Sequence, residues 1–291
     1  MRLKFVLVAA LAAMLCLPLT TAGAKSPKLL GGALARPDFA RAVELKEEAP
    51  DWYTAELHRR AVAAGKKGKT VAVPEGVDLE IPASGLAFTG IRPGSWILFP
   101  AGCTTNFVFG NGTEIGTAGH CANVGDEVTI VAAPGLLMNI GTVSLRRNNG
   151  IGDDFALIDI YPAMQQYVNP SMAHWAGPTG SANPRFGDAV VHSGHGLVIG
   201  TGGTPRAGLV TYTGPGDTGN NNAAYGWDGA ASPGDSGSGV RNATGAAAGN
   251  LTHLVVGTDY LPALIAGTTI SRMEALAGPV STASLIPDPL Y

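Results

Sequence analysis

The chain has 291 residues, enough to bury the core of one large β domain or of two smaller units. Its formal net charge of -3 at pH 7 argues against nucleic-acid binding, which calls for a clustered basic face. Glycine is abundant at 41 residues, and charged residues make up 14%, well below the usual share of about 25%. This balance favours many short strands joined by tight turns.

Residues 1–24 have the layout of a secretory signal peptide. Arg2 and Lys4 precede an apolar stretch that is short for a membrane span, and Ala22 and Ala24 form a small-residue cleavage pattern. We therefore predict cleavage after Ala24, a secreted (extracellular) protein and no stable membrane insertion.

Residues 25–88 differ in composition from the rest of the chain, because no lysine occurs after Lys69. Residues 37–49 and 50–65 each begin with Pro-Asp and keep apolar residues at helical spacing. We predict two short helices followed by a linker, which together form a helical pro-segment or a packed extension. The sequence leaves open whether this part is cleaved.

Residues 89–291 contain short β-type runs separated by Gly, Pro, Asn or Asp. Strands at such short intervals, with little helix, predict an all-β domain, either a sandwich or a barrel. Periodicity does not choose between these two architectures.

Two cysteines remain once the signal peptide is removed, Cys103 and Cys121. Two thiols at this separation are expected to pair in an oxidising compartment. A metal site would need further ligands, and the His192 and His195 pair also lacks a third ligand at suitable spacing. We predict one disulfide, no metal and no cofactor.

Three motifs predict nucleophilic chemistry. Ser236 lies in a Gly-Asp-Ser-Gly turn, where flanking glycines allow a sharp bend that presents the hydroxyl. Serine needs a base and a group that orients the base. His120, next to Cys121, supplies the imidazole, and Asp153 and Asp154, which open an apolar strand, offer the carboxylate.

These motifs, in the chain order His, Asp, Ser, resemble the chymotrypsin-like (trypsin-like) serine protease family. The matching residues are 117–121, 154–157 and 234–237; the resemblance therefore implies that Asp154 is the orienting acid and that Asp153 is a solvated neighbour. The glycine-rich stretch 188–212 is similar to a hairpin of the bacterial streptogrisin-type secreted proteases. The resemblance spans residues 95–277 and does not reach the helical extension.

The resemblance implies two packed six-stranded antiparallel β barrels with the active site in the crevice between them. It implies that the backbone N–H groups of Gly234 and Ser236 form the oxyanion hole, and that Ala230 and Gly267 line a neutral or apolar specificity pocket. The sequence departs from many animal members in lacking their N-terminal activation signal. Asp235 must therefore have a different partner.

The resemblance and the motifs together predict a secreted serine endopeptidase that acts on protein or peptide substrates through His120, Asp154 and Ser236. Two alternatives stay open. One is a catalytically silent binding module on the protease fold, since a fold alone does not fix activity. The other is an esterase that uses the same triad. The sequence does not determine the oligomeric state.

Overall fold

The computed structural model describes residues 37–77, 79, 90–133, 135–196, 204–217, 223–255 and 264–285. These residues all belong to one compact unit that begins at Arg36. The predicted signal peptide, residues 1–24, lies outside the described residues, as do residues 25–36, 78 and 80–89 of the extension and linker.

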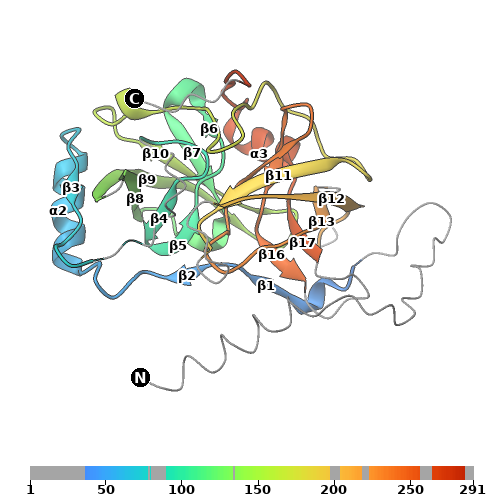
Figure 1. The fold of residues 1–291 in the computed structure, drawn as a ribbon, viewed down its shortest axis with the longest axis horizontal. Helices are drawn as coiled ribbons and strands as arrows, with labels where there is room; N and C mark the ends of the chain where they lie inside the picture. The colour runs from blue at the N-terminus through green and yellow to red at the C-terminus, as the bar shows by residue number, and fades with distance from the viewer. Residues whose placement is uncertain are drawn as a thin grey trace. The chain divides into compact units, whose positions relative to one another are not determined.

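Two antiparallel sheets form this unit (Figure 1). The first has nine strands in the described residues, in the order β2 (Glu47–Glu48), β5 (Ala101–Thr104), β4 (Trp96–Phe99), β8 (Glu127–Ala133), β9 (Leu136–Asn148), β10 (Asp154–Ile160), β7 (Glu114–Thr117) and β6 (Val108–Phe109), with β3 (Val71–Ala72) paired to β9. The second has eight, in the order β1 (Ala42–Glu44), β16 (His253–Val255), β17 (Leu264–Thr268), β13 (Ala224–Asp228), β12 (Thr204–Gly214), β11 (Ala189–Gly194), β14 (Gly239–Asn242) and β15 (Ala247–Asn250). The predicted all-β, two-sheet class is confirmed. Each sheet has more than six strands, in part because the N-terminal segment contributes β1, β2 and β3.

The two sheets are built around apolar cores, as the alternation of side chains along strands requires. Ile97, Ile130 and Ile158 lie in the core of the first sheet, and Tyr225 and Trp227 stack in the core of the second. The described helical segments are α2 (Ala55–Gly65), α3 (Ile270–Ala277) and four short 3₁₀ turns, η1 (Phe39–Arg41), η2 (Gly110–Gly112), η3 (Gly119–Cys121) and η4 (Gln165–Tyr167). None of the helices in the described ranges is long and apolar enough to cross a membrane.

The second predicted helix is present as α2. Its first turn is capped by Thr54, whose hydroxyl oxygen accepts a hydrogen bond from the backbone N–H of Leu57 at 3.2 Å. Leu57 and Ala61 are buried at the i, i+4 spacing of one helix face. Tyr53, just before the helix, donates a hydrogen bond of 2.6 Å to Thr129 of β8, and α2 is therefore fastened to the first sheet.

The first predicted helix, residues 37–49, is wrong. Only η1 is helical there, and the chain then extends through β1 and β2. β1 pairs with β16 of the second sheet and β2 pairs with β5 of the first (Figure 1). The backbone groups of the segment find partners in two existing strands, and these tertiary hydrogen bonds override a weak local helix preference.

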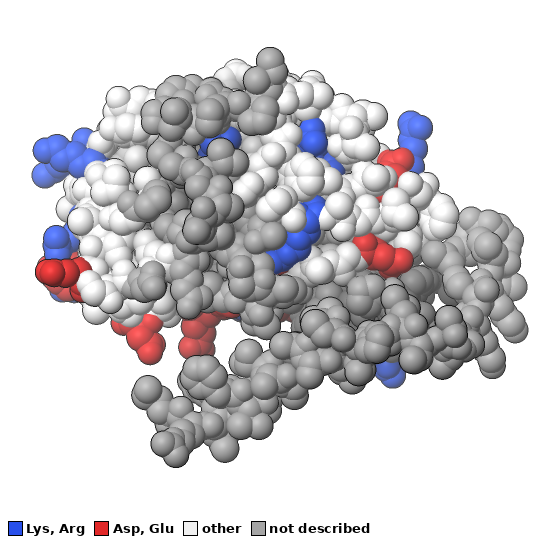
Figure 2. All heavy atoms as spheres, viewed as in Figure 1, with Lys and Arg blue, Asp and Glu red and all other residues white. Residues whose placement is uncertain are grey.

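Charged side chains are scattered over the face drawn in Figure 2. Blue basic and red acidic groups alternate between uncharged areas, and no large field of one sign stands out among the described residues of this face.

Candidate active site

His120, Asp154 and Ser236 lie together although they come from both sheets. His120 is in η3, after β7, and Asp154 begins β10 of the first sheet, whereas Ser236 lies between β13 and β14 of the second. The His120 ring nitrogen Nδ1 is 2.6 Å from Oδ2 of Asp154, and Nε2 is 2.7 Å from Oγ of Ser236. All three residues are buried. When Nδ1–H donates to the carboxylate, Nε2 is left to accept the serine proton.

Asp154 is held from several sides, through its carboxylate and through its backbone. Its Oδ1 accepts the backbone N–H of His120 at 3.1 Å. Asn250 donates to the backbone carbonyl of Asp154 at 3.0 Å, and the backbone N–H of Asp154 donates to the Thr268 hydroxyl at 3.1 Å. Because Asn250 and Thr268 belong to the second sheet, the packing of the two sheets fixes the carboxylate against the imidazole.

Glycine conformations shape the turn around Ser236. Gly234 and Gly237 have φ values of +96° and +93°, a region that residues with a Cβ rarely adopt. A Cβ on Gly237 would lie only 2.1 Å from the carbonyl oxygen of Thr104. The turn therefore approaches β5 closely and presents the serine to His120.

Asp235 has Arg206 as its partner. The guanidinium of Arg206 and the backbone N–H groups of Gly196 and Ser232 all donate to its carboxylate, the last two at 2.9 and 2.8 Å. Burial raises the pKa of Asp235, and the Arg206 charge opposes this rise. An internal ion pair thus anchors the residue before Ser236.

Two backbone N–H groups converge on a single oxygen beside Ser236. The amides of Gly234 and Ser236 both donate to the backbone carbonyl oxygen of Leu45, at 2.7 and 3.2 Å. Donors fixed in this way stabilise an oxygen that gains negative charge during acyl transfer. These are the two amides named by the family resemblance.

Ala230 and Gly267, the residues expected to line the specificity pocket, differ from each other in their surroundings. Ala230 is exposed, while its neighbour Ala231 is half-buried and packs against the apolar cluster that contains Leu45. Gly267 is in β17 opposite Tyr225, and a Cβ there would lie 1.7 Å from the carbonyl oxygen of Asn250. A pocket role for Ala230 and Gly267 stays a prediction.

The predicted disulfide is present between Cys103 of β5 and Cys121 of η3. These two sulfurs and His120 form the one group of three potential metal ligands found in the described ranges. Because the sulfurs are bonded to each other, they offer no thiolate to a metal. The bridge instead ties the turn that carries His120 to a strand of the first sheet.

His253 is a neighbour of the triad that the sequence did not single out. It is buried, its ring centroid is 5.7 Å from that of His120, and its Nδ1 is 3.7 Å from Oδ2 of Asp154. Burial lowers the pKa of His253, although the Asp154 charge opposes this effect. His253 directly follows Thr252 in the sequence, and no motif around it indicates that it lies beside the triad.

The expectation that Asp153 is solvated is wrong. Asp153 is not solvated: it is buried and paired with Arg147 and Arg272 at 2.9 and 2.8 Å. Burial alone would raise the pKa of Asp153, but hydrogen bonds from these arginines and from Asn149 hold it below its ordinary value. Asn250, which heads an Asn-x-Thr triplet typical of surface loops, is fully buried.

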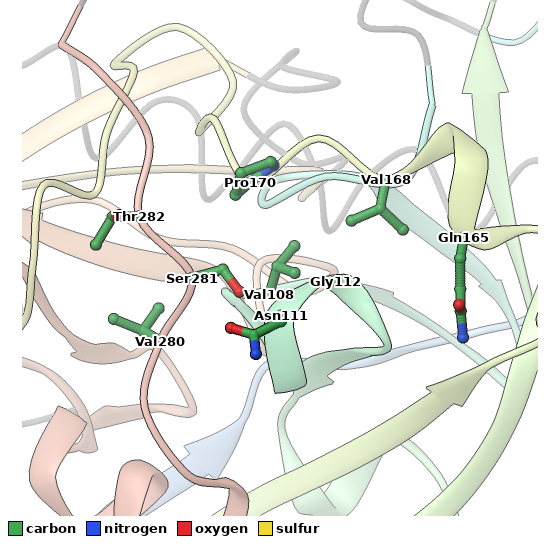
Figure 3. Close-up of a pocket in the computed structure, with 9 residues that line it drawn as sticks. All are labelled: Val108, Asn111, Gly112, Gln165, Val168, Pro170, Val280, Ser281 and Thr282. Carbon is green, nitrogen blue, oxygen red and sulfur yellow. The ribbon is translucent and has the colours of Figure 1, made fainter.

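Figure 3 shows a pocket that is lined by other residues. Its nine lining residues include none of the triad and carry no titratable side chain: Val108, Asn111, Gly112, Gln165, Val168, Pro170, Val280, Ser281 and Thr282. It therefore offers no acid or base for catalysis.

No family model and no curated protein matches the sequence. Among solved structures, the chain resembles a glutamic acid specific serine protease with a TM-score of 0.51 at 17% identity, covering 65% of this chain and 99% of that one. Chymotrypsin from Cellulomonas bogoriensis matches with a TM-score of 0.49 at 18% identity, covering 68% and 99%. Protease A from Thermobifida fusca matches with a TM-score of 0.46 at 20% identity, covering 67% and 99%.

The first of these likenesses, together with the two antiparallel sheets, shows a chymotrypsin-like fold. The predicted resemblance to the chymotrypsin-like serine proteases is thus confirmed at the level of the fold.

Proposed function

We propose that the protein is a secreted serine endopeptidase that hydrolyses peptide bonds through an acyl-enzyme. The observation that carries the proposal is the continuous chain of contacts from the carboxylate of Asp154 through His120 to the hydroxyl of Ser236, at 2.6 and 2.7 Å. The two converging amides beside the hydroxyl add a site for a negative oxygen. Nucleophile, base, orienting acid and oxyanion donors are the parts that acyl transfer requires.

In the proposed reaction, Ser236 Oγ attacks the carbonyl carbon of a peptide bond while His120 Nε2 takes the proton of the serine hydroxyl. Asp154 keeps the imidazole oriented and compensates the positive charge that forms on it. The amides of Gly234 and Ser236 stabilise the oxyanion, a contribution of on the order of a hundredfold or more for one donor. His120 then protonates the leaving amine, and water hydrolyses the serine ester.

Export is supported by two independent features. The first 24 residues have the pattern of a signal peptide. The folded part also contains the Cys103–Cys121 disulfide, and disulfides persist mainly outside the reducing cytosol.

Labelling with a fluorophosphonate reagent tests the nucleophile. Because lysine is absent after Lys69, an immobilised lysine-specific protease can trim the N-terminal segment without cutting the rest of the chain. The trimmed protein should be labelled, and Ser236→Ala should abolish the labelling. Ser232→Ala is the matched control, since the Ser232 hydroxyl has no hydrogen-bond partner in the described part of the chain.

A peptide-library digest compared with the hydrolysis of small esters then identifies the bond that is cut. An endopeptidase should cut internal peptide bonds, with Ser236→Ala inactive on both kinds of substrate. Cleavage of esters alone would indicate an esterase, and a trimmed, folded protein that is never labelled would contradict the enzymatic proposal.

A further inference from the structure

Residues 42–48 of the protein cross the candidate active site in an extended conformation. Glu44 is paired with His253 in the β1 and β16 ladder, and Glu47 is paired with Gly102 in the β2 and β5 ladder. Between these ladders, the backbone N–H of Leu45 donates to the carbonyl oxygen of Thr252 at 3.4 Å. The segment therefore pairs with a strand of each sheet, β1 with β16 and β2 with β5 (Figure 1).

The backbone of Leu45 faces the serine. Its carbonyl oxygen accepts the amides of Gly234 and Ser236 at 2.7 and 3.2 Å, while its own N–H lies 3.1 Å from Ser236 Oγ. The Leu45 carbonyl carbon is bonded to this carbonyl oxygen and is separated from the Leu45 nitrogen by one atom, Cα. These contacts therefore bring the carbon of the Leu45–Lys46 bond next to the hydroxyl, which in turn is 2.7 Å from His120.

The side chain of Leu45 fills an apolar site. Leu45 is the buried residue within residues 40–52, and its exposed fraction is 2%. It belongs to an apolar cluster with residues of the second sheet and with Leu251, just after β15: Val190, Val210, Tyr225, Trp227, Val240, Ala248, Leu251 and Ile265. A charged side chain at this position would lose its hydration among hydrocarbon groups.

The residues after Leu45 remain accessible. Lys46 is exposed, and its Nζ reaches the backbone carbonyl of His120 at 3.3 Å. Residues 46–49 line a groove that also includes His120 and Cys121. An amine released at Lys46 would therefore lie near His120, in a groove open to solvent.

On the basis of the proposed function, we propose that the Leu45–Lys46 bond is a bond that this enzyme cuts in its own chain. We include in the proposal that its substrates carry an aliphatic side chain of leucine size just before the cut bond. Ser236 Oγ bonds to the Leu45 carbonyl carbon, the bond to Lys46 nitrogen breaks, and His120 passes the serine proton to that nitrogen. Water then hydrolyses the ester, leaving a carboxylate on Leu45 and restoring Ser236.

Incubation of the purified full chain tests the self-cleavage. Intact mass and N-terminal sequencing under denaturing conditions should reveal a new chain that begins at Lys46, and Ser236→Ala should remain uncut. Because the bond already lies at the serine, the first-order rate constant should not change on dilution. A rate that rises with protein concentration would contradict cleavage within one chain.

Substitutions at Leu45 test the side-chain preference. Leu45→Met should be cut at a similar rate, whereas Leu45→Ala removes three buried carbons and should slow the cut by on the order of 10- to 50-fold. Leu45→Asp should be cut more slowly still. The trimmed enzyme should also cut a synthetic peptide of residues 42–49. Peptides with Met, Ala, Glu or Lys in place of Leu45 should be cut at rates that fall from Met through Ala to the charged residues Glu and Lys.

The outcomes separate this inference from the proposed function. If the trimmed enzyme is labelled at Ser236 and hydrolyses other peptides, but the full chain keeps its Leu45–Lys46 bond intact on incubation or the trimmed enzyme prefers a charged residue before the cut bond, the inference is wrong and the endopeptidase proposal stands. If the trimmed enzyme is neither labelled nor active on any peptide, both fail.

Discussion

The Cys103–Cys121 disulfide should account for a large part of the stability of the folded chain. The two residues are 18 positions apart in sequence. In the chain-entropy treatment, a closed loop of this length stabilises the folded state by about 3 kcal/mol, because the bridge restricts the unfolded chain. For a domain of this size, that loss lowers the melting temperature by about 6 to 12 °C.

The measurement compares urea unfolding of Cys103→Ala/Cys121→Ala with that of the bridged protein, both carrying Ser236→Ala to prevent self-digestion. Reduction of the bridged protein is the matched control, because it removes the cross-link but keeps both sulfur atoms in the core. The reduced protein should lose a similar free energy of unfolding. A loss below about 1 kcal/mol in both samples would refute the loop-closure reasoning.

Two further predictions concern buried charge and buried histidine, again in the Ser236→Ala background. Arg206→Met leaves the carboxylate of Asp235 buried without its cation, and should lower the free energy of unfolding by about 3 to 5 kcal/mol; adding Asp235→Asn should restore most of the loss in a urea titration. Burial lowers the pKa of His192 from its ordinary value of 6.5 to about 3, so between these values the unfolded chain binds a proton that the folded chain does not. Stability should therefore decrease as the pH falls below 6.5, by about 1.4 kcal/mol per pH unit from this residue, and His192→Leu should flatten the dependence of the urea midpoint on pH. An unchanged pH dependence in His192→Leu would contradict this assignment, as would an Arg206→Met variant as stable as its parent.

Local sequence patterns predicted the parts of the site that depend on short motifs. The histidine beside Cys121 lies 2.6 Å from the aspartate that opens an apolar strand and 2.7 Å from the serine of the Gly-Asp-Ser-Gly turn. The two cysteines are paired. Their catalytic roles stay predictions. Helix α2 was also predictable, because its cap and its apolar face lie within the helix itself.

The structure of residues 37–49, where a helix was predicted, could not be predicted from such patterns. Its sequence is compatible with a helix, yet β16 and β5 supply hydrogen-bond partners that lie far away in the chain. One signal was available, since Val43 and Leu45 are two residues apart, the period of a strand, and charged residues surround Leu45. That pattern is too short to outweigh a helical one without knowledge of the neighbouring strands.

The sequence alone therefore determined the all-β class, the cysteine pair and the identity of His120, Asp154 and Ser236. Each of these depends on a pattern or motif formed by residues that are close together in the chain. Only the tertiary structure decided that Arg206 neutralises Asp235, that Asp153 and Asn250 are buried, and that the Leu45 carbonyl lies between the Gly234 and Ser236 amides. These features arise from contacts between residues distant in sequence, where packing removes water and makes each polar group depend on one particular partner.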